Sequence, residues 1–267
     1  MNFRDFKLKS VIGRLLVYLV LCYSTEQILT MGPLKSSKLV LLALSVTIAA
    51  CSQEHEVQNY FPTEEGIVWI YDVRESHAEE RSTLRQLIYS ESPKESEKVA
   101  TGVLVSLNGS RDFYKSEKQG IYHLGTLPIG RSFSTDKMRK QMMLPRELFV
   151  GKSWRTVAET KLLKASGPWE KPIKISHPVP MENSVYSIQT NTTLKAGKFI
   201  NCVIISSEGK ILVDGGEYLK YFEVKITERK WFAPNVGLIK YIRTESASNK
   251  HIGKATFSMD LKSWNNR

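Results

Sequence analysis

The sequence predicts an all-β domain, mainly antiparallel, preceded by an N-terminal signal helix. Roughly ten segments alternate apolar and polar residues with the period of two that is typical of strands. Turn residues separate these segments at intervals of about 8 to 15 residues, and no long stretch has a helical period. Because strands do not alternate with helices either, we expect one curved antiparallel sheet, arranged as a half-open barrel or as a sandwich.

The first strands of the domain are marked by alternation and by tight turns. Residues 67–74 place Trp69 and Tyr71 in phase with other apolar residues, and their aromatic and β-branched content favours a sheet. Asn108-Gly109 lies between two apolar segments and predicts a hairpin with a type I′ turn, which needs two residues that tolerate positive φ. Further early strands are expected at 84–90, 99–107, 112–114 and 121–124.

The middle and the end of the chain differ in regularity. Residues 125–180 hold six of the ten prolines, and here we expect a helical turn or two at 136–143 and a strand at 153–163. The run from Trp231 to Gly237 predicts a strand and then a turn, because Pro234 cannot donate to a ladder and Asn235 tolerates positive φ. Trp231 is expected to pack inside. The clearer late strands are 186–193, 199–206, 218–227, 238–244 and 255–262.

The apolar run 39–50 indicates where the protein resides. It follows Lys35 and Lys38 and ends at Cys51. It is about ten residues long, which is too short to span a bilayer but typical of the apolar part of a secretory signal. Its end, Ile48-Ala49-Ala50-Cys51, resembles the bacterial lipobox. The resemblance implies cleavage before Cys51 and its acylation by fatty acids such as palmitate, and anchors of two or three acyl chains are stable where one is not.

This interpretation divides the chain into a signal and N-terminal apolar region at 1–50, a lipidated tether at 51–59 and a single antiparallel β domain at 60–267. A second apolar stretch lies at 15–23, but Leu21 rather than a small residue precedes Cys22, so it does not form a lipobox. We therefore expect the functional start at Met31. The alternative is an extended or membrane-inserted N-terminus.

The charge and cysteine content of the chain limit the partners that it is expected to bind. The formal charge is +11, and it falls to +7 on maturation because six basic and two acidic residues lie within residues 1–51. The lysines and arginines are scattered rather than gathered in a stripe, so a nucleic-acid partner is not expected. The simplest interpretation of this charge is a solvated surface. The more specific alternative is that the surface is attracted to anionic head groups or polyanionic envelope polymers. Cys202 lies in an apolar run without a partner cysteine and is expected to be a buried, inert thiol.

No pattern of residues indicates catalysis, a cofactor or a metal. The five histidines are not spaced as ligands, and the nucleophile, zinc and phosphate-loop motifs are absent from the sequence. The acidic pairs Glu64-Glu65 and Glu79-Glu80 are expected at a solvated rim, since neighbours on a strand point to opposite faces. We therefore predict that the protein is not an enzyme. The alternative is an envelope hydrolase whose site is dispersed in sequence.

Aromatic residues are the remaining candidates for a binding site. They form either an apolar pocket or simply the core of the sheet, and the core is the favoured interpretation. These candidates are Trp69, Tyr71, Trp154, Phe199, Phe222 and Trp231.

Three motifs resemble those of uncharacterised β-rich bacterial lipoproteins. They are Tyr60-Phe61-Pro62 with Gly66 and Trp69, the Gly-x-Phe-x-x-Cys motif that starts at Gly197, and Trp231-Phe232-Ala233-Pro234-Asn235-Val236-Gly237-Leu238. The resemblance implies a lipid-anchored envelope protein with a non-catalytic β domain that binds or scaffolds an envelope protein. The half-barrels of the lipoprotein carriers and receptors of the Lol system suggest, by analogy of fold alone, the alternative of a carrier for lipid or another apolar ligand.

Localisation follows from the residue after the predicted lipid site. In enteric-type bacteria an aspartate at that position retains a lipoprotein in the inner membrane, and here the residue is Ser52. We expect the export and sorting machinery to place the protein on the periplasmic face of the outer membrane. The alternative is the outer face of the cytoplasmic membrane.

Overall fold

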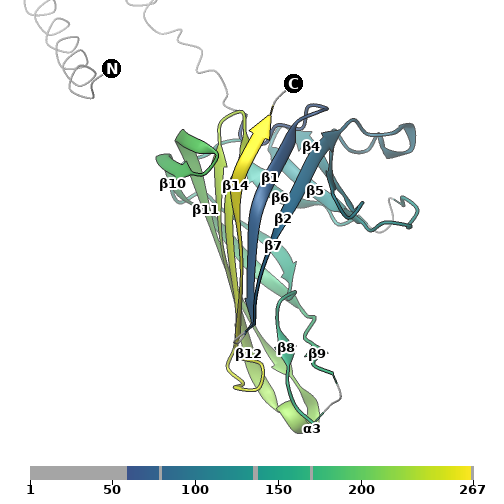
Figure 1. Cartoon of the computed structure of the whole chain (residues 1–267), viewed down its shortest axis with the longest axis vertical. Coiled ribbons are helices and arrows are strands. Elements are labelled where there is room, and N and C mark those ends of the chain that lie inside the picture. Colours follow the sequence, from purple (N-terminus) through teal and green to yellow (C-terminus); the bar gives the residue numbers. More distant parts are fainter. Residues whose placement is uncertain (1–58, 78–79, 135–137, 169–170, 266–267) are drawn as a thin grey trace, which may run out of the picture. The chain divides into compact units, whose positions relative to one another are not determined.

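The computed structural model describes residues 59–77, 80–134, 138–168 and 171–265 (Figure 1). These residues all belong to the compact unit Gln58–Arg267. The two N-terminal apolar stretches, Met31, Cys22, Cys51 and the tether up to residue 58 lie outside the described residues. Within the described part of the chain, no helix has the length and apolar character needed to cross a membrane.

The predicted all-β, antiparallel fold is confirmed. Twelve strands form one sheet in the order β6-β5-β4-β3-β2-β1-β14-β13-β12-β11-β10-β7, and β8 pairs with β9 in a small second sheet. The described helices are the single turns η1 (Glu95–Glu97) and α3 (Gly216–Leu219). The strands are β1 (Val68–His77), β2 (Glu80–Glu91), β3 (Gly102–Ser106), β4 (Arg111–Glu117), β5 (Gly120–Leu127), β6 (Gln141–Pro145), β7 (Ser153–Glu159), β8 (Lys164–Ala165), β9 (Ile173–Lys174), β10 (Pro178–Leu194), β11 (Gly197–Asp214), β12 (Tyr221–Ala233), β13 (Gly237–Ala247) and β14 (Lys254–Asn265).

Side-chain hydrogen bonds join the two edge strands of the large sheet. The indole Nε1 of Trp154 on β7 donates to the carbonyl oxygen of Met142 on β6 (3.0 Å), and the backbone N of Val157 donates to Oε1 of Gln141 (2.7 Å). Because β6 and β7 are the opposite ends of the strand order, these bonds mean that the sheet curls until its edges meet. The result is a nearly closed barrel-shaped sheet rather than a sandwich.

The first described residues pack across one end of this sheet. The carbonyl oxygen of Asn59 accepts a hydrogen bond from the backbone N of Asn235 in the β12–β13 turn (2.7 Å). The ring of Phe61 packs against the ring of Tyr114, with centroids 4.7 Å apart. Phe61 is buried in a cluster formed by β4, β6, β10, β11 and β12. The chain is therefore tied into the interior of the sheet from Asn59 onward.

The end of the β10–β11 hairpin bends over the outer face of the sheet (Figure 1). The pairing of β10 with β11 is interrupted by several register shifts after Val185. At the tip of the hairpin, Nζ of Lys195 lies 2.8 Å from Oδ2 of Asp72 on β1, although four strands separate β10 from β1 in the sheet. Asp72 lies between the buried Tyr71 and Val73, so it points to the outer face, which the hairpin thus crosses.

Two local predictions are wrong. The turn at Asn108-Gly109 forms, but of its two residues only Gly109 takes positive φ (80°), so it is not a type I′ turn. The carbonyl oxygen of Ser106 instead accepts a hydrogen bond from Gly109 N, and Ser106 N donates to Ser110 O. Asn108 Oδ1 accepts a further bond from Ser110 N. This is the pattern of a longer hairpin loop with one left-handed glycine. The helical turns expected at 136–143 are also wrong where the chain is described, because β6 pairs with β5 there.

The predicted turn after Trp231 is confirmed. Asn235 (φ 58°) and Gly237 (φ 90°) both take positive φ, and β12 pairs with β13 across this turn. The expectation that Trp231 packs inside is met only in part, because the side chain is partly buried and packs against the cluster that contains Phe199 and Ile239, but from the outer face. The inward positions are taken by Lys230 and by Phe232, which is completely buried, so alternation directs Trp231 to the outer face, where it is half-buried.

Candidate functional site

The six aromatic candidates do not meet in one pocket. Trp69 and Tyr71 are each 3% exposed, and both polar atoms are bonded within the protein: Trp69 Nε1 donates to Val236 O and Tyr71 OH donates to Leu238 O, each at 2.7 Å. Phe199 is buried in the same cluster. Buried aromatic groups whose polar atoms are satisfied by backbone are typical of core.

Of the other three candidates, Phe222 and Trp154 lie elsewhere in the sheet, and Trp231 packs against the first cluster from the outer face. Phe222 is buried in a separate cluster around β8, α3 and the β13–β14 loop. Trp154 is half-buried at the seam between β6 and β7. Trp231 lies on the outer face with Nζ of Lys240 5.4 Å from its ring centroid. The aromatic set is therefore divided among different regions.

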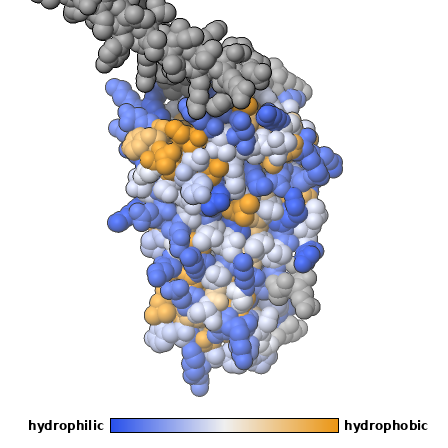
Figure 2. Space-filling view, turned by 90° about the vertical axis from the view of Figure 1, so that its left-hand side faces the viewer, coloured by the Kyte–Doolittle hydropathy of each residue, from blue (hydrophilic) through white to orange (hydrophobic). Residues whose placement is uncertain are grey.

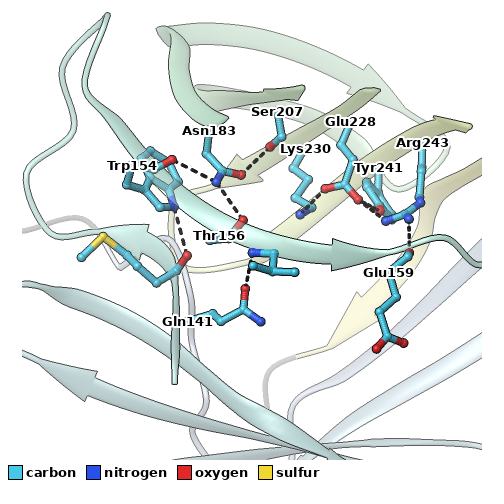
Figure 3. A network of polar contacts seen from close by, with 12 residues as sticks. Gln141, Trp154, Thr156, Glu159, Asn183, Ser207, Glu228, Lys230, Tyr241 and Arg243 are labelled. Atoms are coloured by element: carbon cyan, nitrogen blue, oxygen red, sulfur yellow. Dashed lines mark hydrogen bonds and ion pairs between the residues drawn. The ribbon is translucent and has the colours of Figure 1, made fainter. Parts of the chain in front are cut away.

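A row of buried polar side chains crosses the inner face of the sheet (Figure 3). Register places Asn183 opposite Ser207, Ser207 opposite Glu228, and Glu228 opposite Arg243. Each of these residues is at least nine-tenths buried. We call Asn183, Ser207, Glu228 and Arg243, with Lys230, Tyr241 and Glu245, the polar row.

Asn183 and Ser207 form the part of the polar row nearest the seam. Nδ2 of Asn183 donates to Trp154 O (3.1 Å) and to Thr156 Oγ1 (2.9 Å), both on β7. Oγ of Ser207 donates to Asn183 Oδ1 (2.7 Å). The buried amide thus has partners for both ends, as buried polar groups require, and it fixes edge strand β7 against β10 and β11.

Glu228 is the centre of the charged part of the polar row. Its Oε1 lies 2.5 Å from Nη1 of Arg243 and accepts from the hydroxyl of Tyr241 (2.7 Å). Its Oε2 lies 2.8 Å from Nζ of Lys230. Arg243 also contacts Glu245, with 2.7 Å from Nε to Oε1. Two carboxylates thus balance two cations.

The charged part of the row also holds the chain that leaves β7. Arg243 Nη2 donates to the carbonyl oxygen of Glu159. The carboxylate of Glu245, which is completely buried, accepts from the backbone N of Lys161 (2.9 Å) and of Leu162 (3.0 Å). Residues 159–162 are thereby fixed to β13, which positions β8 and β9 against the inner face.

The electrostatics of the row hold its charges in place. Burial raises the pKa of Glu228, but Lys230 and Arg243 outweigh it and bring the pKa to about 2. Burial, together with the charge of Glu228, raises the pKa of Tyr241 well above its usual value. Burial lowers the pKa of Arg243, but Tyr241, Glu228 and Glu245 outweigh it, so the net pKa rises. None of these three groups changes protonation near neutral pH, as an acid or base in catalysis must.

The sequence contained a signal for this row that the aromatic pattern obscured. In β12, Glu228 stands in phase with the apolar Phe222, Val224 and Ile226. A charged residue at an inward position is unusual unless it is paired. Its partner Arg243 lies on the next strand, and only the register of β12 with β13 brings the two together.

The outer face carries a shallow depression of about 380 Å³ over β11, β12 and β13. Trp231 and Arg229 line it, and the guanidinium of Arg229 lies 4.7 Å from the ring centroid of Tyr186. The other outward-facing residues of the lining are mostly hydroxyl or acidic: Ser206, Glu208, Thr227, Ile242 and Thr244. The face as a whole mixes charged and apolar residues (Figure 2).

Two smaller predictions can be placed in the structure. Cys202 is a free, completely buried cysteine, as expected, and burial raises the pKa of its thiol, which keeps it protonated and unreactive. Among the described residues, no group of three or more histidine, cysteine, aspartate or glutamate side chains is arranged to hold a metal ion.

Comparisons with known proteins find only distant likenesses. No family model and no curated protein matches the chain. Among solved structures it resembles a protein from Parabacteroides distasonis described as a lipoprotein, at 10% identity and TM-score 0.33 over 79% of this chain and 100% of that chain. It also resembles an exported protein with a YmcC-like fold from Bacteroides fragilis, at 11% identity and TM-score 0.32 over 78% and 100% of the two chains. The inference of function rests on the chain's own residues.

Proposed function

We propose that this chain is a lipid-anchored protein of the bacterial cell envelope, and that its β domain has a non-catalytic binding or scaffolding role. The observation that carries the proposal is the lipobox at Ile48-Ala49-Ala50-Cys51 behind a basic and apolar signal. Acylation at Cys51 would hold the domain at a membrane, since only residues 52–58 separate Cys51 from the first residue tied into the sheet.

The polar row supports the non-catalytic part of the proposal. Its carboxylates and cations neutralise each other and bond to backbone groups, so they act as fixed structural contacts rather than as a nucleophile with its base. Together with the distribution of the aromatic side chains over separate clusters, this favours a domain that presents surfaces to a partner. Ser52 favours sorting to the periplasmic face of the outer membrane.

A carrier for an apolar ligand is the second candidate, and one observation favours it. Leu84 on β2 lies directly opposite the buried Val73 on β1, so both side chains point to the inner face, yet Leu84 is 49% exposed. The inner face is therefore open to solvent at this end of β1 and β2. An acyl chain would gain about 0.8 kcal/mol for each CH₂ buried there.

Two measurements test these proposals. Metabolic labelling with a fatty-acid analogue should mark the wild-type protein and not Cys51→Ser, and label that persists in the variant would overturn the anchor. Mass spectrometry of lipid that co-purifies with a chain starting at Ser52 separates the two candidate roles. A stoichiometric lipid that is lost in Leu84→Glu would establish the carrier, and its absence favours the scaffold.

A further inference from the structure

The end of the sheet opposite Asn59 combines exposed apolar side chains with an excess of positive charge. Three segments form it, residues 164–174 apart from 169 and 170, residues 210–223 and residues 248–254, and we call their described residues the basic tip. They pack on one cluster that buries Ala165, Leu219, Phe222 and Ile252. Backbone bonds also connect them, such as Ser166 N to His251 O (3.0 Å) and Ser248 N to Glu223 O (2.9 Å).

Large apolar and aromatic side chains point outward at the basic tip. Val213 and Phe222 are buried and directly opposite each other, so their neighbours Leu212 and Tyr221 face away from the interior. Leu212 is 70% exposed and Tyr221 is 69% exposed. Tyr218 on α3 is also exposed, with its ring centroid 6.0 Å from that of His251. Leu212 and Tyr221 lie diagonally across adjacent strands, close enough to form one surface.

The sequence of the three segments carries more positive than negative charge. Lys210 lies 3.7 Å from Glu223 across the strand pair, so these two charges offset each other. The acidic residues of the tip are Asp214, Glu217 and Glu223, and its lysines are Lys164, Lys171, Lys174, Lys210, Lys220, Lys250 and Lys254. The balance of the described residues is a formal excess of four positive charges.

The basic tip is far from the point at which the chain enters the domain. Asn59 bonds to the turn that follows β12, whereas Tyr221 is the first residue of that strand, which is 13 residues long. At about 3.3 Å for each residue, the two ends of β12 are roughly 40 Å apart. Figure 1 shows α3 and the end of β14 at opposite ends of the sheet.

We propose that the basic tip is a membrane contact that takes an anionic phospholipid leaflet. Tyrosine is enriched where protein meets the interface of a bilayer, because its ring is apolar and its hydroxyl is wet. Leu212 adds apolar area that water otherwise covers. Lysines extend their stems over such a surface and hold their charge at the head groups. This contact does not depend on acylation of Cys51.

The test uses the unlipidated chain that starts at Ser52. This chain holds every described strand and every buried cluster, and a thermal melt by circular dichroism checks its folding. Co-sedimentation is measured with phosphatidylcholine vesicles that contain about one third phosphatidylglycerol, and with pure phosphatidylcholine vesicles. We expect at least about tenfold stronger binding to the anionic vesicles at low salt, with release at high salt because exposed charges are screened.

Variants assign the binding to the basic tip. Leu212→Ser with Tyr221→Ser should reduce binding severalfold, and Lys220→Gln and Lys250→Gln should each reduce it roughly fivefold. The matched control is Ile200→Ser, which removes a 59% exposed apolar side chain near the opposite end of β11 and should leave binding unchanged.

Several results would overturn the proposal. They are failure to bind anionic vesicles, equal binding to both vesicle types, or tip variants that fold and bind as the wild type does. Self-association through the tip in the absence of lipid binding would assign the surface to a second copy instead. None of these results bears on the labelling of Cys51, so failure here is distinguishable from failure of the proposed anchor.

Discussion

At the residue scale, two tryptophans that look alike in sequence have different roles. Trp69 is buried on β1 and its indole donates to Val236 O at 2.7 Å. Trp231 is half-buried on the outer face, beside Lys240. The sequence placed both in apolar surroundings, but Trp231 and Phe232 are neighbours, and alternation allows only one of them to point inward. In the folded sheet, Phe232 takes the inward position and Trp231 the outward one.

We predict that Trp69→Ala destabilises the domain by about 3–5 kcal/mol, because it leaves a cavity and an unpaired carbonyl. Trp231→Ala should cost less, about 1–2 kcal/mol, since that side chain is only partly buried against its cluster. Urea unfolding followed by circular dichroism measures both values. An equal or larger loss for Trp231→Ala would contradict the placement of the two side chains.

Glu228 gives a prediction for the dependence of stability on pH. Its pKa falls from 4.5 to about 2 on folding. A group whose folded pKa is lowered stabilises the protein above its unfolded pKa, and this contribution is lost as pH falls toward the folded value. The free energy of unfolding should therefore decrease by about 3 kcal/mol from this carboxylate between about pH 5 and pH 2.

The variant Glu228→Gln isolates that contribution. It leaves Lys230 and Arg243 without their shared partner, so we expect a loss of about 3–5 kcal/mol at neutral pH. The variant should also show a weaker fall in stability across the acid range, because the titrating carboxylate is gone. Thermal melts at a series of pH values compare the two proteins. Parallel curves for wild type and variant would show that Glu228 is not the group responsible.

At the scale of elements, the pairing of β10 with β11 depends on a position without a side chain. Gly209 lies opposite Met181, and a Cβ at Gly209 would be 2.3 Å from the carbonyl oxygen of Pro180 and 2.5 Å from Sδ of Met181. The first of these atoms is backbone and cannot move without displacing β10.

We predict that Gly209→Ala destabilises the domain by about 2–3 kcal/mol, because overpacking forces the backbone to shift. Gly197→Ala is the control. That glycine has positive φ (129°) but open space around it, so the substitution should cost about 1 kcal/mol from strain alone. Chemical denaturation ranks the two variants, and a smaller loss for Gly209→Ala than for Gly197→Ala would refute the close approach.

The elements that the sequence predicted well are those decided by local pattern. Residues 255–262 alternate cleanly and lie within β14, and Asn235 and Gly237 take the positive φ that their residue types favour. Elements that depend on distant partners were missed. No local pattern indicates that β10 and β11 bend until Lys195 reaches Asp72, or that residues 141–145 join β5 as a strand.

The polar row was missed for the same reason. Each of its members is an ordinary polar residue in its own strand, and only the registers of β10, β11, β12 and β13 bring them to one level of the inner face. The polar atoms of such a buried network all find hydrogen-bond partners only once the whole sheet has formed. Its position therefore cannot be read from any single segment.

At the scale of the whole molecule, the chain combines a predicted lipid signal with a nearly closed antiparallel sheet. The sheet is joined at its edges by Trp154 and Gln141 and crossed inside by balanced charges. Such an interior favours a stable domain that binds partners on its outer surface over a domain that catalyses a reaction in its interior. The proposed function therefore depends most on whether the domain is attached to a membrane through Cys51.

Intact-mass and peptide mass spectrometry of the protein purified from the membrane fraction of a lipoprotein-processing bacterium tests this attachment most directly. We predict that the N-terminal peptide begins at Cys51 and carries two or three acyl chains, and that Cys51→Ser yields an unprocessed or released chain without them. A mature protein that begins at another residue, or a Cys51 that is present but unacylated, would contradict the proposed lipid anchor.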